Sequence, residues 1–305
     1  GYSFTPIGKD SHEFSGVFDG KGYTISGLKV TAKYAGLFGF IKDAEIKNVI
    51  VQGTVTAADS KGHAAGIAAV AKGSSNSITG WGNETTVSSD YYAAGILGSN
   101  FNDSTMTPIT GCYNSGSVSG KSRAAGILAY DNGKANISDC YNIGTITGSD
   151  NAGGIRAHYT SMAGSIQNCY NASPVTGNSA GAIAPGGNNT LKSCFYLNTG
   201  SDKNTGAAAL TLAEMQSSLL GNLGTENWKS VRGVNNSLPV LEWQKVSAPT
   251  ASVELVSDAA FVRSVITTED GDETSLPTAQ LQWSLVAGAK SYTASLWQVV
   301  KTWVP

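Results

Sequence analysis

The sequence predicts an all-β protein: a parallel, right-handed β-helix solenoid, followed by a short C-terminal helical cap and a partial β-sandwich-like tail. The first observation is a six-fold repeat whose central glycine stands at positions 36, 66, 95, 126, 154 and 181. Its period is close to 29 residues, and a unit of short strands this small can bury its apolar face only by stacking on its neighbours. The second observation is a period-two alternation of apolar and small or polar residues, with no sustained helical period before residue 210.

A second motif recurs at the same interval and reads Cys-Tyr-Asn at 112–114, 140–142 and 169–171. The cysteine position (Cys112, Cys140, Cys169 and Cys194) is filled upstream by Leu28, Val49 and Trp81, which indicates that it faces the core. Stacked strands hold equivalent Cβ atoms about 4.8 Å apart, whereas a disulfide needs about 3.8 Å, so we expect four reduced, buried thiols. The asparagines Asn114, Asn142 and Asn171 share one turn position, which predicts a ladder of stacked amides. The recurrent glycines are expected at bends where a Cβ or the φ angle is restrictive.

Three segments are expected along the chain: solenoid repeats over 1–205, a cap over 206–246 and a partial fibronectin- or immunoglobulin-like β segment over 247–305. The stretch 279–300 alternates on both sides of a Gly-Ala turn, which predicts two antiparallel strands. Fifty-nine residues are too few for a complete sandwich, so the last segment is expected to be part of a neighbouring unit.

The cap is expected to open with a helix. Thr211 and Glu214 have the spacing of a capping box, and the helical pattern is expected to stop at Gly221. Trp228 and Trp243 follow, and we expect them to close the open end of the solenoid, because solenoids need such caps.

Composition excludes several classes of protein. The 305 residues carry a net charge of −2 and only 20 Lys and Arg, which are scattered, so nucleic acid is not an expected partner. No apolar run has the roughly 18 residues of a membrane span. The start, GYSFTPIGKD, lacks the basic and apolar regions of a signal peptide, and we expect the chain to be a piece of something longer.

The tyrosine of the Cys-Tyr-Asn motif is the first candidate for binding. If the alternation holds, Tyr113, Tyr141, Tyr170 and Phe195 point outward in a column that could stack on pyranose rings or anchor a protein. The alternative is that these rings pack on each other or lie under the C-terminal segment.

A second candidate strip precedes the recurrent glycine. Its members are Tyr34, His63, Tyr91, Tyr92, Arg123 and Asn151. Varied residues at one position of a regular scaffold are typical of a binding face, but variable surface turns show the same pattern. Tyr92 and Arg123 are the members that we single out as binding residues.

The acidic residues give weak candidates for a metal. Asp59, Asp90 and Asp150 share one position before the recurrent glycine and could form a stripe that binds Ca²⁺ or sugar hydroxyls. The alternative is that they are solvated turn residues. No Cys/His spacing indicates a metal site, His63 and His158 have no companion ligands, and no catalytic residue or cofactor is predicted.

The segments FSGVFDGKGYTISGLKV, YAGLFGFI, AEIKNVIVQGTV and LPVLEW resemble, in this order, the GLUG-repeat β-helices. Such repeats occur in large surface proteins of Gram-positive and gut bacteria, including some immunoglobulin A proteases and cell-wall-anchored adhesins. The resemblance covers roughly residues 1 to 245 and implies an extracellular, cell wall-associated or secreted setting. The tail LQWSLVAGAKSYTASLW resembles strands of a fibronectin type III domain.

The sequence therefore favours a non-catalytic, adhesin-like surface module that binds a host glycan or host protein, or that acts as a rigid spacer beside neighbouring modules. The alternative is a carbohydrate-active β-helix enzyme, a polysaccharide lyase or glycoside hydrolase. Two carboxylates about 5 to 10 Å apart in one cleft would favour the enzyme.

Overall fold

The computed structural model describes residues 3–102, 106–160, 164–186, 190–198, 206–246, 260–267 and 273–280. The chain divides into two compact units, Gly1–Ala248 and Pro249–Pro305. No helix in the described part of the chain is both long enough and apolar enough to cross a membrane.

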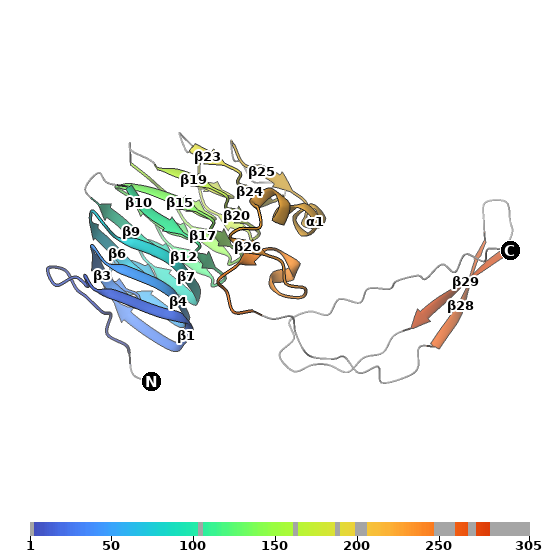
Figure 1. Ribbon diagram of the computed structural model, residues 1–305, viewed down its shortest axis with the longest axis horizontal. Coiled ribbons are helices and arrows are strands. Elements are labelled where there is room, and N and C mark those ends of the chain that lie inside the picture. Colours follow the sequence, from blue (N-terminus) through green and yellow to red (C-terminus); the bar gives the residue numbers. More distant parts are fainter. Residues whose placement is uncertain are drawn as a thin grey trace. The chain divides into compact units, whose positions relative to one another are not determined.

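The first unit is a β-solenoid of about six turns, built from parallel strands that stack coil upon coil (Figure 1). One wall is a six-stranded sheet of β2 (Tyr34–Ala35), β5 (His63–Ala65), β8 (Tyr92–Ala94), β13 (Arg123–Ala125), β18 (Asn151–Gly153) and β22 (Ser179–Gly181). The next wall is a four-stranded sheet of β3 (Phe38–Lys42), β6 (Ala68–Gly73), β9 (Leu97–Asn102) and β14 (Leu128–Asp131). In the first four coils these two walls follow each other, one before and one after the recurrent glycine.

A fifteen-stranded sheet forms the rest of the wall. Its long strands are β1 (Val17–Ala32), β4 (Glu45–Ala57) and β7 (Ser77–Ser89). The later coils break the same path into short strands: β10 (Met106–Thr110), β11 (Tyr113–Asn114), β12 (Val118–Gly120), β15 (Lys134–Ser138), β16 (Tyr141–Asn142), β17 (Ile146–Gly148), β19 (Ser165–Gln167), β20 (Tyr170–Asn171), β21 (Val175–Thr176), β23 (Thr190–Lys192), β24 (Phe195–Leu197) and β25 (Ala208–Leu210).

Equivalent residues of successive sequence repeats pair with each other in the sheet. Tyr113 pairs with Tyr141 and Tyr141 with Tyr170, and the asparagines pair one residue later in the same way. The predicted parallel solenoid is thus confirmed. Its interior is filled by columns of like residues, among them Ile46, Ile78, Ile109, Ile137 and Ile166, and Val55, Val87, Val118, Ile146 and Val175.

A ladder of buried asparagine amides runs through four consecutive coils. Asn83 donates from Nδ2 to Oδ1 of Asn114 at 2.6 Å, Asn114 to Asn142 at 2.7 Å, and Asn142 to Asn171 at 2.7 Å. Each Nδ2 also donates to the carbonyl two residues further along the chain. The predicted ladder is confirmed, and Asn83 extends it by one coil.

The recurrent glycines face this ladder. A Cβ on Gly66 would lie 1.9 Å from Oδ1 of Asn83, and a Cβ on Gly95 would lie 2.3 Å from Oδ1 of Asn114. Their φ angles are not in the left-handed region. The glycine is therefore required by the close approach of the amide and not by an unusual backbone conformation.

The four cysteines are free and buried, as predicted. Cys140 and Cys169 each place Sγ 3.1 Å from a backbone carbonyl two residues earlier, on Ser138 and Gln167. Burial raises the pKa of all four thiols, which makes them poor nucleophiles.

The cap comprises α1 (Leu212–Leu223), β26 (Trp228–Lys229), the 3₁₀ turn η1 (Asn235–Ser237) and β27 (Val240–Leu241). The capping box is present, since Glu214 N donates to Thr211 Oγ1 and Thr211 N donates to Glu214 Oε2. The helix does not stop at Gly221: it runs through Leu223, and Gly224 caps it with φ of 85°. Gly224 has the open space and the positive φ that suit glycine at a helix end.

The sequence suggested that the cap closes an open end of the solenoid, but the structure places it elsewhere. It lies along one side, where α1 contacts β24 and β25 (Figure 1). Trp243 donates to the Gly111 carbonyl at 2.8 Å, and Lys245 reaches the carbonyl of Lys21 in β1. The cap therefore spans coils from the last to the first.

In the second unit, β28 (Ala260–Thr267) and β29 (Glu273–Gln280) form an antiparallel pair with Thr267 opposite Glu273. The strands predicted over 279–300 lie outside the described residues, apart from positions 279 and 280. The resemblance of that stretch to a fibronectin domain stays a prediction.

Replacing Asn142 by alanine is expected to lower the free energy of unfolding by about 2–4 kcal/mol, because it leaves the amide of Asn114 and the carbonyl of Gly144 unsatisfied in the interior. The matched control is Asn178→Ala at an exposed turn, which should change stability by less than about 0.5 kcal/mol. Urea unfolding measures both. Equal effects of the two substitutions would contradict the role of the ladder.

Candidate functional site

The tyrosine column is stacked but not exposed. The rings of Tyr113 and Tyr141 are 5.3 Å apart and nearly parallel, and those of Tyr141 and Tyr170 are 5.1 Å apart at 3°. These three residues are only 3%, 2% and 0% exposed, and Phe195 is half-buried beside them. The predicted outward binding column is therefore wrong as an accessible surface, and the alternative that the rings pack under the C-terminal segment describes it.

The cap supplies the cover. Met215, Leu219, Leu223, Trp228, Leu238 and Leu241 pack with the tyrosines in one apolar cluster. The Tyr141 hydroxyl donates to Oε1 of Gln244 at 3.0 Å, and the Tyr170 hydroxyl donates to the Pro239 carbonyl. The cap thus supplies hydrogen-bond acceptors to these two buried hydroxyls, while the Tyr113 hydroxyl donates to Glu84 of β7 at 2.7 Å.

The three aspartates do not form a metal site. Asp59 pairs with Lys33 at 3.8 Å and Asp90 with Lys121 at 2.9 Å, while Asp150 accepts a hydrogen bond from Ser122. Among the described residues no group of three or more His, Cys, Asp or Glu is placed to hold a metal. In place of the predicted acidic stripe, two of the acids form ion pairs with lysines and the third accepts a hydrogen bond from a serine.

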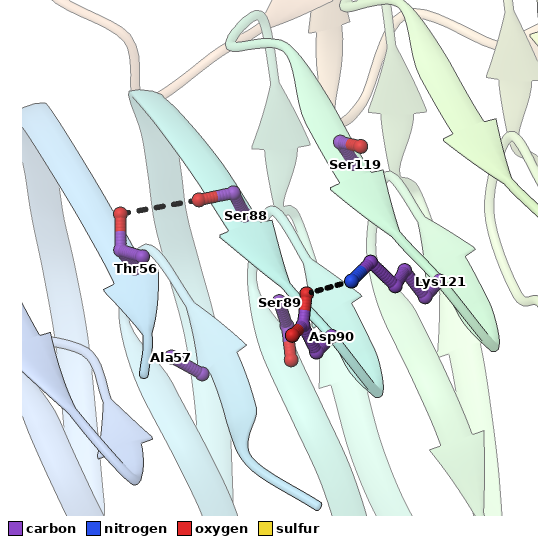
Figure 2. A pocket seen from close by; sticks show the side chains of 7 residues that line it. All are labelled: Thr56, Ala57, Ser88, Ser89, Asp90, Ser119 and Lys121. Atoms are coloured by element: carbon purple, nitrogen blue, oxygen red, sulfur yellow. Dashed lines mark hydrogen bonds and ion pairs between the residues drawn. The ribbon is translucent and has the colours of Figure 1, made fainter. Parts of the chain in front are cut away.

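Asp90 and Lys121 line a shallow pocket whose other walls are mainly hydroxyl side chains (Figure 2). Thr56, Ser88 and Ser119 follow one another in register, and Ser88 donates to Thr56 at 3.1 Å. The carboxylate of the pocket is already paired with its lysine, as the dashed line in Figure 2 shows. No second carboxylate lines this pocket, so it lacks the pair that glycoside hydrolysis needs.

The second strip is brought together. Tyr34 pairs with His63, His63 with Tyr92, Tyr92 with Arg123, and Arg123 with Asn151, each one coil apart. The outward side chains of the adjacent four-stranded sheet join them. We use the name aromatic strip for Tyr34, His63, Tyr91, Tyr92, Phe101, Arg123 and Tyr130.

Small residues explain why these rings lie close to the wall. Ala65, Ala94 and Ala129 form a fully buried floor beneath Tyr91, Tyr92 and Tyr130. The rings of Tyr91 and Tyr92 stack at 3.8 Å, and those of Tyr92 and Tyr130 at 5.0 Å. Tyr91, Phe101, Arg123 and Tyr130 keep part of their surface in solvent.

Arg123 lies between two of the rings. Its guanidinium carbon is 4.7 Å from the ring centroid of Tyr92 and 4.5 Å from that of Tyr130. Nη1 donates to the Tyr92 hydroxyl, whereas Nε is buried and finds no hydrogen-bond acceptor among the described residues. Burial and the hydrogen bond to Tyr91 raise the pKa of Tyr92, so its hydroxyl remains protonated.

His63 is held neutral within the strip. It is 7% exposed, and burial, followed by the charges of Lys33 and Arg123, lowers its pKa to about 4. Its Nδ1 lies 2.7 Å from Oγ of Ser99. A serine beside a histidine has the composition of a nucleophile and its base, but Ser99 is fully buried and the described residues supply no carboxylate to orient the imidazole. The pair is therefore a buried structural hydrogen bond.

A buried ion pair was missed by the sequence reasoning. Arg156 takes the interior position that Leu128 fills one coil earlier, and its Nη1 lies 3.3 Å from Oδ2 of Asp131. Asn100 donates to the same carboxylate at 2.9 Å. Both charged side chains are 0% exposed, so the pair is part of the core. An arginine in the copy GGIRA, where other copies have an apolar or small residue, was the available signal.

Phe101 and Tyr130 were also not predicted as strip members. Their strands, β9 and β14, belong to the four-stranded sheet. The sequence repeat does not predict the angle between this sheet and the six-stranded sheet. Tyr130 occupies the outward position that Val70 and Ser99 fill in earlier coils.

The fold places the chain among the β-solenoid proteins. No model of a known protein family matches it, and no curated protein does. Among solved structures it is similar to a proposed immunoglobulin A1 protease from Bacteroides ovatus, with a TM-score of 0.52 and 18% identity, over 74% of this chain and 77% of that one. At this identity the likeness concerns the fold alone.

The buried His63 makes stability depend on pH. The unfolded chain binds a proton on this histidine near pH 6.5, whereas the folded protein does so only near pH 4, so the unfolded state holds more protons between these values. The free energy of unfolding should therefore fall as the pH is lowered through this window, by about 3 kcal/mol for this residue. His63→Gln should remove that part of the pH slope, and His12→Gln at an exposed site should retain it. Urea unfolding across the pH range measures the slopes, and equal slopes for His63→Gln and the unsubstituted protein would contradict the assignment.

Proposed function

We propose that this chain is a non-catalytic recognition module of an exported bacterial surface protein of the GLUG-repeat kind, and that it binds a host glycan through the aromatic strip. The observation that carries the proposal is the set of partly exposed rings and one arginine gathered on an alanine floor. Aromatic faces suit the apolar faces of pyranose rings, and a rigid wall holds them without a cost of ordering on binding.

The resemblance of the repeats to surface adhesins supports the setting. The proposed protease that shares the fold does not extend its activity to this chain, because the likeness concerns the fold alone. Two alternatives are that the chain binds a host protein or that it acts as a rigid spacer. The experiment below distinguishes them from glycan binding.

The enzymatic alternative lacks a supporting observation. Asp59 and Asp90 are each bound to a lysine, and the aromatic strip holds no carboxylate. Ser99 cannot reach a substrate from its buried position. A lyase or a hydrolase would need acids or bases that face an accessible cleft.

A glycan array of the purified chain tests the proposal. The Tyr130 ring is stacked between Tyr92 and His158, so it offers a sugar its exposed edge. Tyr130→Ala should weaken binding of the retained glycan by roughly tenfold, because loss of this aromatic contact costs about 1–1.5 kcal/mol. The matched control is Tyr23→Ala, a highly exposed ring of the first coil outside the strip, which should bind normally. Thermal melts confirm that both variants fold.

Silence of the array for the unsubstituted chain would overturn glycan recognition and favour the spacer or a protein partner. If Tyr130→Ala binds the glycan as well as the unsubstituted chain does, the glycan site lies outside the aromatic strip.

A further inference from the structure

Arg123 is a cation that the structure surrounds with aromatic rings instead of carboxylates. The neighbouring turn cations Lys33 and Lys121 each form an ion pair, with Asp59 and Asp90. Within the described part of the chain, Arg123 forms no such ion pair; its contacts are two ring faces and the hydroxyl of Tyr92. Of the five N–H donors of a guanidinium, that on Nε is buried and one on Nη1 bonds to Tyr92, so the other donors on Nη1 and Nη2 are left for a ligand.

The hydrogen bonds around Arg123 run in one direction. Arg123 can only donate, and it donates to the Tyr92 hydroxyl. That hydroxyl in turn donates a hydrogen bond to the Tyr91 hydroxyl at 2.9 Å. The chain thus ends on the Tyr91 hydroxyl, whose proton has no acceptor among the residues that the structure describes. Both ends of this network therefore have hydrogen-bond donors that are free to donate. A ligand group that only accepts hydrogen bonds would be complementary to them.

The local charge agrees with this direction. His63 and His158 are both held neutral by burial, and the charge of Arg123 contributes to the lowered pKa of each. The charges that act on these two histidines are positive, from Lys33 and Arg123. A negative group on a ligand would therefore be attracted to this part of the strip.

We propose that the aromatic strip binds a sugar that carries a carboxylate, and that Arg123 and the Tyr91 hydroxyl receive the carboxylate while the ring of Tyr130 contacts the sugar. This inference rests on the proposed function and names its ligand class.

The chemistry favours a carboxylate over other anions. The planar guanidinium matches the two oxygens of a carboxylate, and one arginine balances a single negative charge. A phosphate ester carries up to two charges and is usually met by several cations, whereas the strip supplies Arg123 alone beside the two tyrosines.

The experiment compares sugars that differ in the carboxylate. Binding of the whole chain to 3′-sialyllactose and to digalacturonic acid is measured by calorimetry, beside lactose and the methyl ester of digalacturonic acid. One acidic sugar should bind at least about tenfold more tightly than its neutral counterpart, and that ratio should fall at high salt. Which acidic sugar binds separates a sialic acid source from a uronic acid source.

Variants assign the effect to Arg123. Arg123→Gln should abolish the preference for the carboxylate, and Arg123→Lys should restore only part of it, because lysine lacks the planar fork. Tyr91→Phe keeps the ring and removes one donor, so it should reduce the preference severalfold even if Arg123→Gln folds poorly. Lys192→Gln, an exposed lysine on β23, is the charge-matched control and should retain the preference.

The two proposals fail in different ways. Equal binding of acidic and neutral sugars that Tyr130→Ala abolishes and Arg123→Gln leaves intact would overturn the carboxylate ligand and keep the glycan-binding strip. Absence of binding to every sugar, together with a silent glycan array, would overturn both.

Discussion

The contact between buried asparagine amides and the recurrent glycines is the constraint on which the rest of the solenoid depends. Each amide bonds to the amide of the next coil and to its own turn, so a shift of one residue between coils would break every bond of the ladder. Only glycine fits opposite, because a Cβ on Gly66 or Gly95 would collide with the amide oxygen. This contact fixes the register, and the register places every other column of like residues.

Whether a column of like residues is buried or exposed then depends on what covers it. The cysteine and isoleucine columns face the interior, while the tyrosine column faces out and is buried by the cap. The aromatic strip also faces out, but within the described part of the chain no residue of the cap belongs to the apolar clusters that contain its rings. The candidate site is thus the aromatic column that no capping segment covers.

Much of this fold could be predicted from the sequence, since a period near 29 residues with interchangeable apolar residues at one position specifies stacked coils. Buried Cys140 and the ladder of Asn142 follow from that period. The burial of Tyr141 could not be predicted, because residues 206–246 are outside the repeat and their path along the side depends on where apolar surface remains. The Asp131–Arg156 pair and the place of Tyr130 depend on contacts between walls, which a periodic pattern does not encode.

The most direct test of this account is the chemical accessibility of individual tyrosines, measured by nitration of the folded chain and mass spectrometry of its peptides. Tyr23, which is 70% exposed, serves as the internal reference. The account predicts modification of Tyr91 and Tyr130 in the strip and protection of Tyr141 and Tyr170 until the chain is unfolded. Modification of Tyr141 and Tyr170 at the rate of Tyr23 would contradict the covered column, and with it the assignment of the open site to the aromatic strip.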